Sequence, residues 1–256
     1  MFRVKFTNSS LSHRGGRGTD SPRHAAAEFI ATAMLLIAVV GSGIAAQRLS
    51  PADVGLELLE NAVVTGAALV AIILALGPVS GAHMNPVVTL ADGMLGGTPW
   101  REVPVYVAAQ VCGGAFGTVI ANLMFGLPAV SMSSHQRAGS GLWLGEVVAT
   151  FGLLVVVYGV AHSGRPAFAP FAVGAYITGA YWFTSSTSFA NPAVTLARTL
   201  SDTFAGIAPA NAPLFILMQL AGGGLGLAAV RLLYPVHKES SEEVKTCLPE
   251  FNLRSM

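Results

Sequence analysis

Six long apolar stretches most strongly constrain what this chain can fold into. A helix that crosses a bilayer needs about 20 mostly apolar residues, and six stretches come close to that length. They cover residues 25–46, 58–76, 103–125, 142–161, 167–183 and 213–234. Charged residues make up only 11% of the chain, against about 25% in an ordinary soluble domain. The sequence therefore predicts an all-α membrane protein with six membrane-spanning helices.

Two shorter apolar segments, residues 85–94 and 191–200, each span half a bilayer and each open with Asn-Pro. Proline is favoured at the first helical position, and an asparagine before it can cap the helix. A half-length helix at membrane depth is tolerated only where its irregular approach loop is buried in protein or lines water. We therefore expect six full spans plus two half-helices.

An internal repeat relates the two halves of the chain. The segments AEFIAT (27–32), HMNPVVTLA (83–91) and AQVCGG (109–114) recur in the same order as GEVVAT (145–150), FANPAVTLA (189–197) and MQLAGG (218–223). Each repeat holds three spans, an odd number, so the second copy must enter the membrane inverted. Inverted repeats with interrupted helices place the functional site near the midplane, where the half-helices meet.

The two half-helices predict the chemistry of that site. Each helix dipole places roughly half a positive elementary charge at the helix N-terminus. Asn85 and Asn191 can donate hydrogen bonds into a pore while their side-chain oxygens cap the backbone. Such a site repels cations and hinders proton passage along a water file, whereas neutral hydrogen-bonding solutes can pass.

At these residues the chain resembles the major intrinsic protein family, the aquaporins and aquaglyceroporins. Residues 80–89, SGAHMNPVVT, are similar to the first family signature, and Asn191-Pro192-Ala193 to the second; after Asn85-Pro86, Val87 stands where alanine is usual. The resemblance covers about residues 24–235. It implies an aquaporin-like right-handed bundle of six transmembrane helices plus two half-helices, assembled as a homotetramer with one pore per protomer.

The resemblance also assigns supporting roles. Glu28 and Glu146 match buried family glutamates that hold the half-helix loops by hydrogen bonds. His83 matches a loop histidine on the cytoplasmic side of the pore, where it either lines the pore or anchors the loop.

The chain departs from the family at the four-residue selectivity filter. By counting from the two asparagines, we place the filter at Thr65, Gly179, Ser188 and Val194. Val194 stands where arginine is usual, so a wide filter with small side chains is expected. Arg198, one turn further on the same helix face, either supplies a cation to the outer mouth or, as we expect, extends into the outer water.

The sequence leaves two alternatives for the transported solute. Filters without the arginine resemble those of bacterial channels associated with arsenic detoxification, which favours metalloid acids such as arsenite together with polyols and water. The alternative is a glycerol facilitator without a metalloid role: Pro213-Leu214 resembles the glycerol-conducting branch, but Thr195 replaces its usual aspartate. A coupled secondary transporter is a further alternative, because inverted repeats with broken helices also build transporters.

Charge predicts orientation and excludes other classes. With the amino terminus in the cytoplasm, only three of the 14 Lys/Arg lie outside, namely Arg48, Arg137 and Arg198, as the positive-inside rule requires. A net charge of +1 gives no reason to expect nucleic acid. We find no nucleophile motif and no metal-ligand cluster, so we expect no enzyme, cofactor or metal.

The predicted organisation has three parts. A basic cytoplasmic arm (1–23) precedes the channel domain (24–235; repeats about 24–126 and 140–235), and a cytoplasmic tail (236–256) follows it. The predicted location is a plasma membrane, the inner membrane of a bacterium. The predicted partners are small neutral solutes, the lipid bilayer and further copies of the chain.

Overall fold

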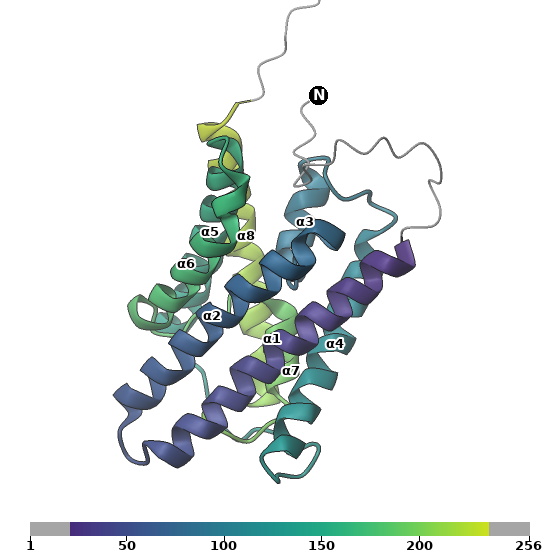
Figure 1. Ribbon diagram of the computed structural model, residues 1–256. Coiled ribbons are helices and arrows are strands. Elements are labelled where there is room, and N and C mark those ends of the chain that lie inside the picture. Colours follow the sequence, from purple (N-terminus) through teal and green to yellow (C-terminus); the bar gives the residue numbers. More distant parts are fainter. Residues whose placement is uncertain (1–20, 236–256) are drawn as a thin grey trace, which may run out of the picture.

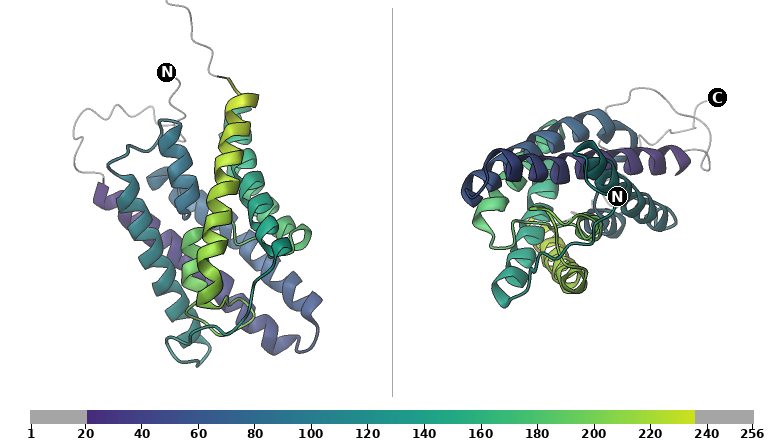
Figure 2. Two further views of the ribbon diagram at one scale, coloured as in Figure 1. Left: turned by 180° about the vertical axis from the view of Figure 1, so that it is seen from behind. Right: turned by 90° about the horizontal axis from the view of Figure 1, so that it is seen from below.

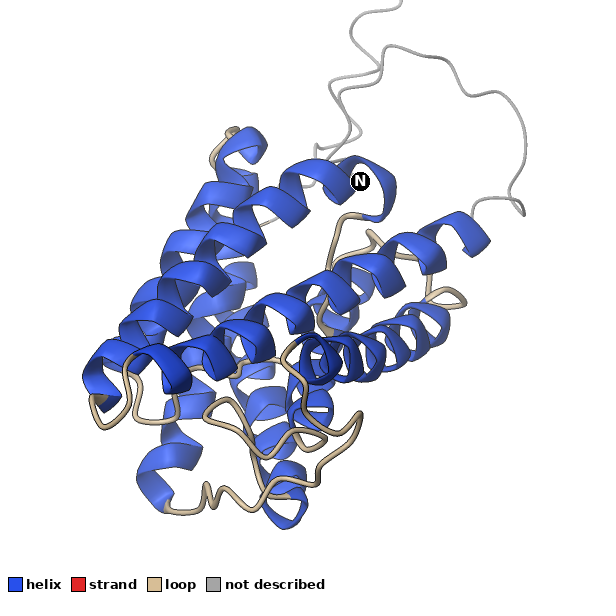
Figure 3. Cartoon of the chain, turned by 60° about the horizontal axis from the view of Figure 1, so that its bottom comes forward, coloured by secondary structure: helices blue, strands red, loops and turns tan. Residues whose placement is uncertain are grey.

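The computed structural model describes residues 21–235, and every regular element within them is a helix (Figure 3). The predicted all-α fold is confirmed. Most of the predicted arm and the whole predicted tail lie outside the described residues. The division into arm, channel domain and tail stays a prediction.

The helices follow the two-repeat order that the sequence predicts. The first repeat contains α1 (Ser21–Leu49), α2 (Val54–Ser80), the half-helix α3 (Pro86–Met94) and α4 (Val103–Met124). The second contains α5 (Ser140–His162), α6 (Ala169–Phe183), the half-helix α7 (Pro192–Arg198) and α8 (Ala212–Leu233). Short 3₁₀ turns, η1 (Pro166–Phe168) and η2 (Pro209–Asn211), precede α6 and α8.

The two repeats pack as similar units around a shared interior. Helix α1 lies against α4, and α5 lies against α8, while α2 and α6 join the two units (Figures 1 and 2). The half-helices α3 and α7 lie inside the bundle and contact both α4 and α8. We call the end where α1 begins and α8 ends the termini end, and the other end the distal end (Figure 1).

Helix α6 is shorter than the other spans. Within residues 21–235, five segments are long and apolar enough to cross a membrane: α1, α2, α4, α5 and Pro209–Leu233. Helix α6 has only 15 residues, because Pro166 and Pro170 favour a 3₁₀ turn before it. Together η1 and α6 extend about 28 Å, close to the roughly 30 Å of a bilayer core. This element fills the place of the predicted span 167–183.

Glycines allow the paired helices to approach closely. A Cβ atom at Gly113 of α4 would lie 2.3 Å from the carbonyl oxygen of Phe29 on α1. In the second repeat, a Cβ at Gly222 of α8 would lie 2.4 Å from the carbonyl oxygen of Val147 on α5. Small residues at helix contacts are how membrane helices gain dense packing. The two repeats therefore share close glycine-mediated helix packing as well as the same order of helices.

Substituting Gly222 with alanine is expected to destabilise the bundle by about 1–3 kcal/mol, because the methyl group forces α5 and α8 apart. Gly224→Ala is the matched control on the same helix, since a Cβ there meets nothing within 4 Å. The control should match or slightly exceed the wild type. Thermal unfolding of the purified protein in detergent measures both, and equal midpoints for the two variants would contradict this account of the packing.

Candidate functional site

The two Asn-Pro segments begin the half-helices as the sequence predicts. Asn85 caps α3, and its Oδ1 accepts a hydrogen bond from the Val87 amide at 2.9 Å. Asn191 caps α7, and its Oδ1 accepts from the amides of Ala193 at 3.0 Å and Val194 at 3.3 Å. Pro86 and Pro192 occupy the first helical positions, where a missing N–H costs nothing.

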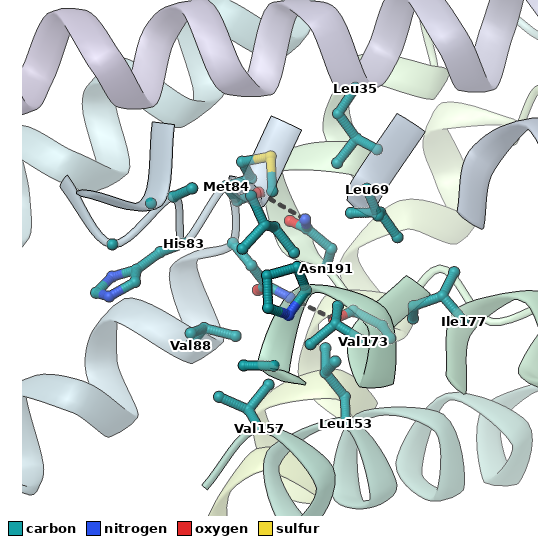
Figure 4. A pocket seen from close by; sticks show the side chains of 18 of the residues that line it. Leu35, Leu69, His83, Met84, Val88, Leu153, Val157, Val173, Ile177 and Asn191 are labelled. Atoms are coloured by element: carbon teal, nitrogen blue, oxygen red, sulfur yellow. Dashed lines mark hydrogen bonds between the residues drawn. The ribbon is translucent and has the colours of Figure 1, made fainter. Parts of the chain in front are cut away.

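Reciprocal hydrogen bonds join the two caps. Asn85 Nδ2 donates to the carbonyl oxygen of Ala190 at 2.8 Å, and Asn191 Nδ2 donates to that of Met84 at 2.7 Å (Figure 4). Each amide thus binds the residue that precedes the other asparagine. Because an amide nitrogen carries two N–H groups, one N–H of each asparagine remains for a passing molecule.

The loops that lead to the two caps adopt an unfavourable backbone conformation. The φ angles are positive at Ala82 (46°) and Met84 (51°), and again at Ser188 (50°) and Ala190 (49°). These residues stand three positions and one position before each asparagine. Non-glycine residues in this region cost of order 1–3 kcal/mol each and persist only where the surroundings hold them. Both loops therefore need anchors.

Glu28 of α1 is the anchor of the first loop. The carboxylate is fully buried and accepts hydrogen bonds from the backbone amides of His83 at 2.9 Å and Met84 at 2.8 Å. The Ser80 hydroxyl and the Gln110 amide of α4 also donate to it, at 2.6 and 2.8 Å. Four donors around one carboxylate fix the loop to two spans.

Glu146 of α5 repeats this arrangement in the second half. It accepts from the amides of Phe189 at 3.0 Å and Ala190 at 2.9 Å, and from Gln219 of α8 at 2.6 Å. Gln219 also donates to Thr195 Oγ1 at 2.8 Å. The two buried carboxylates therefore occupy equivalent positions, each bound to its own half-helix loop.

A cavity of about 410 Å³ runs past the paired caps, and its wall is mainly apolar (Figure 4). Asn85 and Asn191 both line it. Pro78, Asp92 and Pro166 line it toward the termini end. Lining residues toward the distal end include Thr65, Ser188 and Arg198. The half-helices thus meet along this cavity, which we call the conduit, rather than in a closed core.

Three of the four predicted filter residues line the conduit, and one does not. Thr65, Ser188 and Val194 are part of its wall. Gly179 is not, and its nearest non-neighbouring side chain is that of Phe183. The prediction for Gly179 is wrong for the described cavity. The inward face of α6 carries every fourth residue, Val173, Ile177 and Tyr181, and Gly179 lies on another face.

Tyr181 takes the place that we predicted for Gly179. It follows Val173 and Ile177 on the inward face of α6, and all three line the conduit. Its hydroxyl lies 3.2 Å from Thr65 Oγ1 of α2. Sequence analysis missed Tyr181, although its four-residue spacing from Ile177 was visible.

Arg198 does not reach outward into water, contrary to the expectation from the sequence. Its side chain is 2% exposed and lines the distal part of the conduit. The guanidinium carbon lies 3.5 Å from the ring centroid of Phe189, and Nε donates to the carbonyl oxygen of Ala205. The 199–211 loop folds over α7 and removes the water that Arg198 would otherwise reach.

His83 lines the conduit and also contacts its own half-helix. Its Nδ1 lies 3.1 Å from Thr89 Oγ1, and its Nε2 lies 3.9 Å from a carboxylate oxygen of Asp92. The two alternatives of pore lining and loop anchoring are thus compatible. In residues 21–235 no group of three or more His, Cys, Asp or Glu could hold a metal ion.

Comparison with known proteins agrees with this class, a multi-pass membrane protein with an internal conduit. The family profile described as major intrinsic protein matches residues 17–188. Aquaglyceroporin AqpS from Rhizobium meliloti (strain 1021) is 46% identical over 228 residues, covering 88% of this chain and 97% of the relative. Aquaporin AqpM from Methanothermobacter marburgensis is 32% identical over 236 residues, covering 81% and 95%.

The fold also matches a solved structure. The aquaglyceroporin from Plasmodium falciparum superposes with a TM-score of 0.64 at 21% identity, over 88% of this chain and 99% of that one. The chain belongs to the major intrinsic protein family, a family of membrane channels.

Proposed function

We propose that this protein is a passive channel for small polyols, metalloid acids such as arsenite, and water. Family membership supports a channel for solutes of the water and glycerol type. The observation that carries the proposal is the pair of capped half-helices, joined through Asn85 and Asn191, on the wall of the 410 Å³ conduit.

The midplane favours neutral solutes for an electrostatic reason. Two helix N-termini each contribute roughly half a positive charge, whereas Glu28 and Glu146 accept hydrogen bonds from the loops and are not part of the conduit wall. A cation entering this region loses hydration and meets positive potential. A neutral solute needs only hydrogen-bond donors, and the two asparagine amides supply them.

The wall beyond the midplane accounts for solutes larger than water. Val194 stands where the family resemblance places an arginine, and Ser188 and Thr65 are also small. The hydroxyl groups of Ser188 and Thr65 can form hydrogen bonds with the oxygens of a polyol or a trihydroxy acid, while the methyl groups of Val194 contact its less polar face. An amphipathic passage of this kind suits both glycerol-like and metalloid cargo.

Arsenite uptake into proteoliposomes tests the metalloid part of the proposal. We expect wild-type uptake well above empty vesicles and a fall of at least fivefold in Asn191→Asp. Aspartate keeps the oxygen that caps α7 but loses the N–H donors and adds a negative charge. Glycerol flux without arsenite flux would leave a glycerol facilitator, and solute counterflow would indicate a coupled transporter.

We further propose a homotetramer in a bacterial inner membrane with the termini end in the cytoplasm. Within residues 21–235, the ends of the bundle differ in basic residues. The termini end carries Arg23, Arg101, Arg165 and Arg231, whereas the distal end carries Arg48, Arg137 and the buried Arg198. An excess of basic residues on the cytoplasmic side is the usual determinant of orientation.

A further inference from the structure

Arg137, in the loop between α4 and α5, is a buried cation at the distal end of the bundle. It is 7% exposed. Its Nε donates to the carbonyl oxygen of Gly206 at 2.8 Å, and its Nη2 donates to that of Phe204 at 3.1 Å. Its backbone amide donates to Asn211 Oδ1 at 2.9 Å. Arg137 therefore ties its loop to the segment that follows α7.

Arg198 binds the same segment. Its Nε donates to the carbonyl oxygen of Ala205, which lies between the two carbonyls that Arg137 binds. Both guanidinium groups also approach one aromatic ring, with their central carbons 3.5 Å (Arg198) and 5.1 Å (Arg137) from the Phe189 ring centroid. Two arginines from distant parts of the chain thus converge on three successive carbonyls and one ring.

Among the described residues no carboxylate lies within ion-pair distance of this cluster, and the buried Glu146 acts on both arginines only at longer range. Within residues 21–235, neither arginine forms an ion pair. Burial, followed by the proximity of Arg198, lowers the pKa of Arg137 to about 9. Carbonyl dipoles and the face of the ring stabilise the two cations, but they do not cancel their field in the conduit.

The two arginines differ in their access to the conduit. Arg198 lines it, and its terminal nitrogens have no hydrogen-bond partner among the described residues, so they are free to face a passing ion or solute. Arg137 is not part of the wall and acts only through the segment and the ring that it contacts.

The repeat shows that this charge is specific to the distal end. Arg198 stands seven residues after Asn191, and the residue seven after Asn85 is Asp92, which lines the conduit toward the termini end. The two equivalent positions therefore carry opposite charges. A barrier built from Arg198 opposes cations at one mouth only.

We propose that Arg198 is a second cation barrier of the conduit, located one helical turn beyond Val194, and that Arg137 is the positioning residue that holds it there. The inference rests on the proposed channel function. A fixed positive charge on the wall of a partly dehydrated passage raises the energy of an entering cation. It also provides hydrogen-bond donors to neutral solutes.

Potassium leak into proteoliposomes, divided by glycerol flux in the same preparation, tests this proposal. We expect the ratio to rise at least tenfold in Arg198→Gln and about threefold in Arg137→Gln. Arg198→Lys and Arg137→Lys, which keep the charge, should stay within twofold of wild type. A loss of packing alone would not be rescued by lysine at both sites.

Arg48→Gln is the matched control. Arg48 also lies at the distal end, donates to the Phe125 carbonyl at 2.7 Å and stacks on the Phe125 ring at 5.3 Å, but it does not line the conduit. Its ratio should equal that of wild type. If Arg198→Gln does not fold, the ratio of potassium leak to glycerol flux is compared between Arg137→Gln and Arg137→Lys. A higher ratio in Arg137→Gln supports the barrier, and equal ratios contradict it.

The outcomes separate the two proposals. Glycerol flux in the wild type with an unchanged ratio in the folded glutamine variants would overturn the cation barrier alone. Glycerol flux no greater than in empty vesicles would overturn the channel proposal and the barrier with it.

Discussion

Val194→Arg is expected to lower glycerol and arsenite flux at least tenfold, while water flux falls much less. Val194 lies in the first turn of α7, on the conduit wall with Ser188 and Thr65. A guanidinium there would occupy the space left by an isopropyl group and would stand one turn from Arg198. A polyol must pass this point with little room, whereas a water molecule is far smaller. Stopped-flow light scattering of proteoliposomes under glycerol and sucrose gradients measures the glycerol and water fluxes, and arsenite uptake into the same vesicles measures the third.

Val194→Leu separates size from charge at the same position. Leucine adds one methylene without donors or charge, so glycerol flux should fall only a few-fold. If Val194→Arg conducts glycerol as well as the wild type does, the inner side chains of the distal half do not set the width of the pore, and the assignment of Val194 to the filter is wrong.

Glu146→Leu is expected to destabilise the protein by about 3–5 kcal/mol, the range for breaking a buried, hydrogen-bonded charge network. The carboxylate is fully buried and accepts from the amides of Phe189 and Ala190 and from Gln219. Each donor left without a partner costs about 1–3 kcal/mol. The loop also loses the anchor that holds Ser188 and Ala190 at positive φ.

Thermal unfolding in detergent and glycerol flux measure this loss together. Glu28→Leu should behave alike, because Glu28 has the equivalent partners His83, Met84 and Gln110 in the first repeat. Glu60→Gln is the control, since Glu60 on α2 is only part-buried and has, among the described residues, a single side-chain hydrogen bond, from the Ser50 hydroxyl at 2.9 Å. Its effect should stay below about 1 kcal/mol. A Glu146→Leu protein with wild-type stability and flux would contradict the proposed role of the buried carboxylates.

Local sequence signals predicted the half-helices well. Asparagine followed by proline defines a helix start through short-range chemistry, and both caps form at the expected residues. The repeat also pointed to Gln110 and Gln219 as equivalent positions. Their hydrogen bonds to Glu28 and Glu146 could not be predicted from the sequence, because the bonded residues lie on different helices and are 82 and 73 positions apart in the chain.

The wrong predictions share a physical cause. Counting from Asn191 back to α6 crosses a loop in which Thr187, Ser188 and Ala190 have positive φ. Regular spacing is lost there, and Tyr181 rather than Gly179 faces the conduit. The burial of Arg198 depends on the fold of the 199–211 loop and on Phe189. Helical periodicity contains no information on either.

A combined measurement of glycerol and proton flux tests the central claim most directly. Wild-type protein is reconstituted in vesicles that contain a pH-sensitive dye, and swelling in glycerol is followed together with proton entry under an imposed pH gradient. We predict glycerol flux well above empty vesicles with proton entry at the level of the bare bilayer. Rapid proton entry through the wild-type protein, or glycerol flux no greater than in empty vesicles, would contradict a neutral-solute conduit with two half-helices meeting at its centre.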